Sequence, residues 1–206
     1  MIVHHFTTPI TTPFARKSTQ IYGDLHRFWE KAKIKESAKK PEITGLYRLI
    51  KGYKIMIKIL FVCHGNICRS PMAEFLLKDM IKKEGLADRF VIASAGTSRE
   101  EIGNPVHQGT RKKLAQDHIS AAGKYAVQLT KEDYEKYDLI LGMDRANISN
   151  ILRIIGSDPQ EKVHRLLDFT ELPRDIADPW YTGDFEITYA EIKAGCAALL
   201  KHLRRF

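Results

Sequence analysis

The sequence has few cysteines, no long apolar run and no cluster of metal ligands. Only 3 cysteines occur among 206 residues, too few for the disulfide framework of a small secreted protein, so we expect a cytoplasmic location. No run of 18 or more apolar residues appears, so no transmembrane helix is expected. No cysteine or histidine pair has the spacing of metal ligands, and we expect neither a metal nor another cofactor.

Positive charge is concentrated in the N-terminal segment. Residues 1–55 hold 11 of the 33 Lys and Arg and 4 of the 25 Asp and Glu, so residues 56–206 hold 22 against 21. The net charge of +8 therefore says little about the remainder of the chain. Three interpretations of residues 1–55 stay open: a wrongly assigned upstream start, a disordered basic tail, or a targeting or membrane-surface segment.

Apolar runs that alternate with helical patterns predict a single α/β domain from residue 56 onward. We expect strands at 57–62, 90–95, 138–142 and 163–167, and helices at 71–84, 105–117, 145–155 and 184–204. A short helix should begin near Thr130, which we expect to cap it. This order predicts three layers, with a mostly parallel four-stranded sheet and helices on both faces. Cys196 falls on the apolar stripe of the last helix and should be a core thiol.

The most informative segment joins the first strand to the first helix. Cys63 and Arg69 are separated by five residues, and the loop between them should curl at a helix N-terminus, where N–H groups and the helix dipole favour an anion. A thiol in that position ionises readily, and a guanidinium suits bidentate binding of phosphate. The loop therefore combines a thiolate nucleophile with an anion site.

The other loop residues fit a tight turn around an anion. Gly65 and Asn66 tolerate a positive φ. Ser70 should be the N-cap of the helix, with Pro71 at its first position. The Ser70 hydroxyl is also close enough in sequence to donate a hydrogen bond to the Cys63 sulfur.

Residues 62–71, Val-Cys-His-Gly-Asn-Ile-Cys-Arg-Ser-Pro, resemble the loop of the low-molecular-weight protein-tyrosine phosphatases. The resemblance covers residues 56–206 and includes Asp178-Pro179-Trp180-Tyr181, which is similar to the family's general-acid motif. It implies a flavodoxin-like phosphatase I fold and a catalytic domain at 56–206. It also implies a phosphate-binding loop made of His64, Gly65, Asn66, Ile67, Cys68, Arg69 and Ser70.

The resemblance assigns further roles. Cys63, Arg69 and Asp178 would be catalytic, with Asp178 as the general acid. Trp180 and Tyr181 would wall a slot deep enough for phosphotyrosine, and Cys68 would be the redox partner of Cys63. Lys124 stands near the position where relatives often have a histidine that supports the loop asparagine, and Asp144 and Asn147 could support the site.

Several alternatives remain at this point. Arsenate reduction on the same fold passes a disulfide along three cysteines, two of them on a mobile segment beyond the loop, and no cysteine lies between Cys68 and Cys196. Relatives that dephosphorylate arginine carry Thr where Ile67 stands. A non-catalytic phosphate-binding module would have lost Cys63, Arg69 or Asp178, and a nucleic-acid or membrane binder would act through residues 1–55. We expect a monomer that acts on phosphotyrosine proteins, a bacterial tyrosine kinase among them, without nucleic acid at the catalytic domain.

Overall fold

The structure, a computed structural model, describes residues 56–204, so the predictions for residues 1–55 lie outside the described residues. Four parallel strands form one sheet in the order β2-β1-β3-β4. Their bounds are β1 (Ile57–Cys63), β2 (Phe90–Gly96), β3 (Leu139–Gly142) and β4 (Val163–Arg165). The predicted parallel sheet is confirmed.

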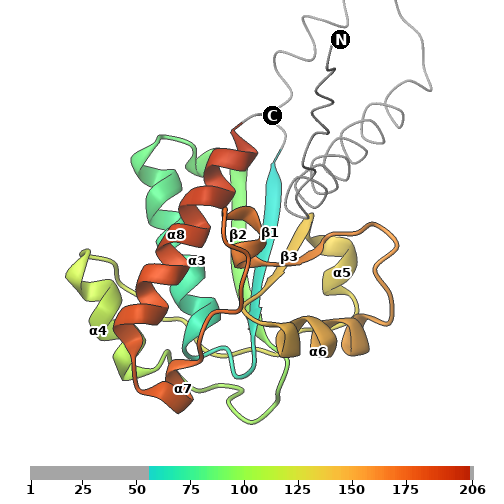
Figure 1. Ribbon diagram of the computed structural model, residues 1–206, viewed down its shortest axis with the longest axis horizontal. Helices are drawn as coiled ribbons and strands as arrows, with labels where there is room; N and C mark the ends of the chain where they lie inside the picture. Colours follow the sequence, from blue (N-terminus) through green and yellow to red (C-terminus); the bar gives the residue numbers. More distant parts are fainter. Residues whose placement is uncertain (1–55, 205–206) are drawn as a thin grey trace, which may run out of the picture. The chain divides into compact units, whose positions relative to one another are not determined.

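Helices cover both faces of this sheet (Figure 1). One face carries α3 (Arg69–Lys83), α4 (Gln108–Gln116) and α8 (Phe185–Leu203). The other carries α5 (Asp133–Lys136) and α6 (Arg145–Ile155). Three short helices, η1 (Ala87–Arg89), η2 (Leu166–Phe169) and α7 (Pro179–Thr182), lie in the connections. The predicted three-layer α/β architecture is therefore correct.

Alternation along β1 divides the core between the two helical layers. Leu60 and Val62 pack in a cluster with Ile151 and Ile155 of α6. Ile59 and Phe61, which point to the opposite face because side chains alternate along a strand, are fully buried. Cys196 of α8 is also fully buried, and its thiol lies 3.7 Å from the carbonyl oxygen of Ala73 in α3. The prediction of a core thiol is confirmed.

Two capping predictions are wrong. Helix α3 begins at Arg69 with Cys68 as its N-cap and no side-chain cap, because the Ser70 hydroxyl is engaged by Asn66 and the Ala95 carbonyl instead. Helix α5 begins at Asp133 after Glu132. The sequence predicts that Thr130 accepts a hydrogen bond from the first turn of this helix. Instead, its backbone N–H and its hydroxyl both donate to the Asp133 carboxylate.

The strand expected at 163–167 ends earlier, at Arg165, where the chain turns into η2. A capping box forms there, because the Asp168 carboxylate accepts from the Arg165 backbone N–H at 3.1 Å and from its guanidinium. This local pairing stabilises the turn in which the strand ends and η2 begins.

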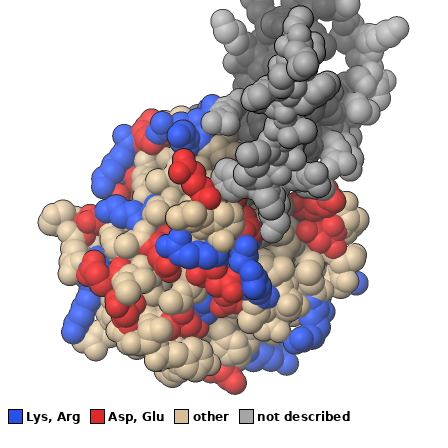
Figure 2. Space-filling model, in the orientation of Figure 1, with Lys and Arg blue, Asp and Glu red and all other residues tan. Residues whose placement is uncertain are grey.

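Charged side chains of both signs are intermixed on the face shown in Figure 2. This distribution agrees with the near balance of 22 basic and 21 acidic residues over 56–206. Between residues 56 and 204, the helices are all too short or too polar to cross a lipid bilayer.

Candidate active site

The loop between β1 and α3 lies against the carboxyl end of β2. The backbone N–H groups of Thr97 and Ser98 donate to the carbonyl oxygens of Cys63 and His64, both at 2.9 Å. At Gly96 a Cβ atom would lie 2.8 Å from the His64 carbonyl oxygen, closer than real Cβ contacts. A glycine at the end of β2 is therefore needed for the loop to pack this closely.

Asn66 holds the loop in its conformation. It has φ of 58° and is 1% exposed. Its side-chain amide donates to the hydroxyls of Ser70 at 2.9 Å and Ser94 at 2.8 Å, and its carbonyl accepts from the Val127 N–H at 3.1 Å. Because every polar group of this side chain is bonded, Asn66 ties the loop to α3, β2 and the segment before α5.

A buried carboxylate lies beneath this network. The Ser94 hydroxyl donates to Glu74 at 2.6 Å, and Glu74 is 4% exposed. Lys124 lies 3.4 Å from the same carboxylate and donates to the Ser94 carbonyl at 2.9 Å. Lys124 thus lies beside the network, as expected, but it contacts Ser94 and Glu74 while Asn66 is held by other groups.

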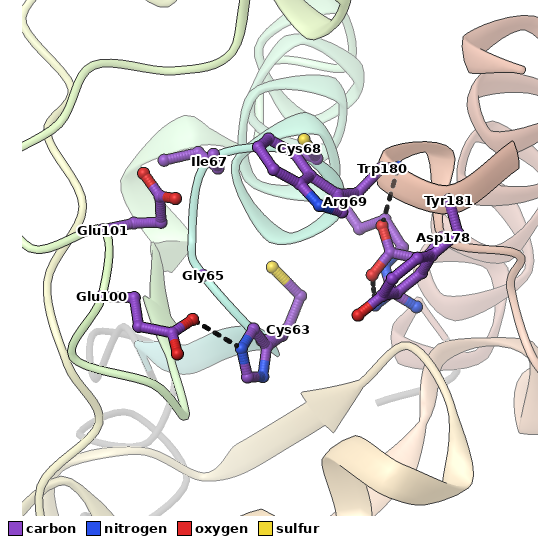
Figure 3. A pocket seen from close by; sticks show the side chains of 11 residues that line it. Cys63, Gly65, Ile67, Cys68, Arg69, Glu100, Glu101, Asp178, Trp180 and Tyr181 are labelled. Atoms are coloured by element: carbon purple, nitrogen blue, oxygen red, sulfur yellow. Dashed lines mark hydrogen bonds and ion pairs between the residues drawn. The ribbon is translucent and has the colours of Figure 1, made fainter. Parts of the chain in front are cut away.

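Cys63 points into the centre of the loop (Figure 3). Its sulfur lies 3.1 Å from the Ser70 hydroxyl oxygen, as the sequence predicted. The Ser70 hydroxyl also lies 3.2 Å from the Ala95 carbonyl oxygen. Because the hydroxyl has one proton, it can donate a hydrogen bond either to that carbonyl or to a negatively charged Cys63 sulfur.

The second cysteine of the loop, Cys68, is in a different environment. Burial, and then the charges of Cys63 and Asp178, raise the pKa of its thiol to about 12. Cys68 therefore stays protonated at neutral pH.

Arg69 is 2% exposed and held by carboxylates. Its Nη1 donates to Asp144 at 2.6 Å and to the Ile176 carbonyl at 3.0 Å, and its Nη2 is paired with Asp178. Burial alone would lower the pKa of Arg69, but Cys63, Asp178 and Asp144 together raise it. Within the described residues its Nε is buried without a hydrogen-bond partner, which leaves a donor for an anion in the loop.

Asp144 belongs to the scaffold of Arg69. It is the N-cap of α6, and its second oxygen accepts from the Asn147 N–H at 2.6 Å. The Asn147 side chain in turn accepts from the Met143 N–H at 3.2 Å. These bonds fix the carboxylate that orients the Arg69 guanidinium, so both residues lie where the sequence suggested a supporting role.

The segment with Asp178 forms one wall of a pocket. Asp178 is the N-cap of α7 and accepts from the Trp180 N–H at 3.1 Å. Trp180 is 60% exposed and Tyr181 is 84% exposed, so neither ring is a core residue. The pocket is lined by Cys63, His64, Gly65, Ile67, Cys68, Arg69, Glu100, Glu101, Asp178, Trp180 and Tyr181. All of the sequence-predicted site residues line this pocket except Asn66 and Ser70; the Ser70 hydroxyl still contacts the Cys63 sulfur, and Asn66 is bonded to Ser70.

Sequence reasoning missed five contributors to the site. Glu74, Ser94 and Gly96 act through contacts with segments distant in the chain. Glu100 and Glu101 are adjacent carboxylates after a strand, a pattern that is common on solvated surfaces. No group of three or more His, Cys, Asp or Glu between residues 56 and 204 is placed to hold a metal.

Known proteins resemble this chain in sequence and in fold. The family model described as low molecular weight phosphotyrosine protein phosphatase matches residues 58–206. The chain belongs to this family. It is 41% identical over 152 residues to low molecular weight protein-tyrosine-phosphatase YfkJ of Bacillus subtilis, covering 73% of this chain and 97% of that one.

Another relative and two solved structures support the same family and fold. PtpA of Staphylococcus epidermidis is 36% identical, over 72% of this chain and 94% of its own. The crystal structure of YfkJ superposes with a TM-score of 0.71, over 73% of this chain and 96% of that one. SP-PTP of Streptococcus pyogenes superposes with a TM-score of 0.64 at 40% identity, over 72% of this chain and 93% of that one. The resemblance stated from the sequence is therefore confirmed for the family and the fold.

The Asn66 contacts generate a prediction. Asn66→Ala loses three hydrogen bonds and puts at positive φ a residue that tolerates the left-handed region less well than Asn, a strain of at most about 1–2 kcal/mol. We expect unfolding free energy to fall by about 2–4 kcal/mol and kcat to fall at least tenfold, measured by denaturant titration and steady-state turnover. Asn66→Gly is the matched control, because it removes the hydrogen bonds without the backbone strain and should be less destabilising. Wild-type stability and kcat in Asn66→Ala would contradict this role.

Proposed function

We propose that the chain hydrolyses phosphotyrosine through a cysteinyl-phosphate intermediate, with Cys63 as nucleophile, Arg69 as phosphate ligand and Asp178 as general acid. As a member of its family it is a protein-tyrosine phosphatase. The observation that carries the residue assignment is the meeting of these three side chains, from the phosphate-binding loop and from the distant segment before α7, around one pocket. The buried, unpaired Nε of Arg69 supplies a donor for the phosphate.

In the first step the Cys63 sulfur attacks phosphorus in line with the leaving phenol. The sulfur–phosphorus bond forms, the bond from phosphorus to the phenol oxygen breaks, and its electrons go to that oxygen. Loop N–H groups at the N-terminus of α3 and the Arg69 guanidinium stabilise the equatorial oxygens. Asp178 gives its proton to the departing oxygen.

Asp178 needs to be protonated for this step. In the described structure its carboxylate is paired with the Arg69 guanidinium. A phosphate dianion bound in the loop competes with Asp178 for the same guanidinium, which frees the Asp178 carboxyl to face the leaving oxygen. In the second step Asp178, now a carboxylate, takes a proton from water, whose oxygen attacks phosphorus and releases the Cys63 thiolate.

The pocket favours phosphotyrosine over other substrates. The exposed rings of Trp180 and Tyr181 form a wall along which a phenyl ring can lie. Ile67 lines the pocket where relatives that act on phosphoarginine carry Thr.

The arsenate reductase alternative is disfavoured, because Cys196 is fully buried in α8. Cys68 is proposed as the redox partner of Cys63: peroxide oxidises the Cys63 thiolate to a sulfenic acid, which condenses with the Cys68 thiol, loses water and gives a disulfide.

We further propose that residues 56–206 form the catalytic domain and residues 1–55 a basic extension outside it. The match of the family to residues 58–206 supports this division. In this proposal the protein is a cytoplasmic monomer that uses no metal or other cofactor. Its substrates are phosphotyrosine proteins, with a bacterial tyrosine kinase among them. The catalytic domain binds no nucleic acid.

Replacing the nucleophile tests the assignment. Cys63→Ser should abolish turnover of phosphotyrosine peptides yet still bind inorganic phosphate in calorimetry, because Arg69 and the loop N–H groups remain. Cys196→Ala, assayed below its melting temperature, is the control and should keep turnover. Near-normal turnover by Cys63→Ser would refute the nucleophile.

A comparison of leaving groups tests the general acid. Asp178→Asn should slow hydrolysis of phenyl phosphate by about 10²–10⁴-fold and that of p-nitrophenyl phosphate far less, because nitrophenolate leaves without a proton. Asp144→Asn is the contrast, since Asp144 contacts Arg69 and should affect both substrates alike. Equal losses in Asp178→Asn would show that Asp178 is not the acid.

Truncation tests the domain division. A chain of residues 56–206 should fold and turn over phosphotyrosine peptides at nearly the rate of the full chain, because all of the proposed site residues lie within it. Thermal unfolding and steady-state kinetics of the two chains provide the measurement. A melting temperature lower by several degrees would place residues 1–55 within the folded domain.

A further inference from the structure

The pocket has two chemically different walls (Figure 3). Trp180 and Tyr181 lie on one side of Cys63, and Glu100 and Glu101 lie on the other. The mechanism uses the first wall and leaves both glutamates without a function. Their side chains reach the pocket from the segment that follows β2.

This segment is held firmly against the phosphate-binding loop. The Thr97 and Ser98 N–H groups bond to loop carbonyls at 2.9 Å, and the Gly103 N–H bonds to Ala126 at 2.9 Å. The Glu100 N–H is bonded to the Ser98 hydroxyl at 3.1 Å. The backbone that carries both glutamates is thus fixed relative to Cys63.

The side chains are positioned as well. The stem of Glu101 lies over Gly65, where a Cβ would be 2.9 Å from its Cγ, and its carboxylate accepts from Asn104 at 2.7 Å. The Glu100 carboxylate lies 3.2 Å from the His64 ring, and its side chain is 77% exposed. Both carboxylates therefore stand at the mouth of the pocket at fixed places.

The charges near this mouth are mostly negative. Glu100, Glu101 and Asp178 are the carboxylates that line the pocket. Among the lining residues, positive charge comes from Arg69 and from His64 when it is protonated. Arg69 is already paired with two carboxylates, those of Asp144 and Asp178. Arg99, the neighbour of Glu100, is exposed but does not line the pocket. A substrate must carry its phosphate dianion past this wall, so the charge of the flanking residues matters.

We propose that Glu100 and Glu101 form an acidic specificity wall that selects phosphotyrosine sites flanked by Lys or Arg and disfavours sites flanked by Asp or Glu. This inference rests on the proposed function and names its substrate class. Opposite charges at the rim of an interface mainly raise the rate of productive association, and like charges lower it. The selection therefore appears in kcat/KM, and it weakens as salt screens the exposed carboxylates.

The test uses the full chain and three phosphotyrosine peptides of equal length, with Lys, Ala or Glu at the two positions on each side of the phosphotyrosine. At low ionic strength the wild-type chain should prefer the Lys peptide to the Glu peptide by about five- to tenfold in kcat/KM, in keeping with exposed charge pairs. In the double variant Glu100→Gln/Glu101→Gln the ratio should fall below about twofold.

Glu135→Gln is the matched control. It removes one negative charge from α5, far from the phosphate-binding loop. The residue that follows α5 closely, Asp138, accepts a hydrogen bond from the Lys58 N–H at the start of β1, and the loop follows the other end of that strand. This variant should keep the wild-type ratio. Because Glu101 also packs on Gly65, Glu100→Gln alone and the salt dependence of the wild-type ratio test the proposal if the double variant is unstable.

The outcomes are distinguishable. A ratio near one in the wild-type chain at low salt, or an unchanged ratio in both Glu100→Gln and the double variant, overturns the acidic wall while turnover of the Ala peptide upholds the proposed function. Failure of the wild-type chain to hydrolyse even the Ala peptide would instead refute the proposed function.

Discussion

The conformation of the phosphate-binding loop depends on a single buried side chain, Asn66. A residue with φ of 58° is unfavourable unless surrounding contacts fix it, and Asn66 is fixed by hydrogen bonds to Ser70, Ser94 and Val127. These bonds close the loop around the Cys63 sulfur and align it with the N-terminus of α3. Because the network ends on the buried Glu74, the geometry of the loop is tied to the core of the domain.

The second constraint is the burial of Arg69. A buried guanidinium requires negative partners, and Asp144 and Asp178 supply them from two different segments. This pairing places the proposed general acid beside the proposed phosphate ligand before any substrate binds. In the proposed mechanism a phosphate dianion then takes over part of the guanidinium from Asp178.

The sequence predicted what depends on local patterns and on the motif. The alternation of apolar runs gave the parallel sheet and both helical layers, and the Cys63–Arg69 spacing located the loop. The capping role of Ser70 was wrong, because a long-range contact with Ala95 engages its hydroxyl. Glu74 and Gly96 could not be assigned to the site from the sequence, since their contacts join segments far apart in the chain.

The central claim is that phosphate is transferred to the Cys63 sulfur. Acid quenching of the wild-type chain within the first turnover of p-nitrophenyl phosphate, followed by mass spectrometry of its peptides, tests this claim directly. The account predicts a phosphate on the peptide that contains Cys63, carried by its sulfur, which disappears as substrate is exhausted. A phosphate on any other residue, or no phosphorylated peptide during rapid turnover, would contradict the account.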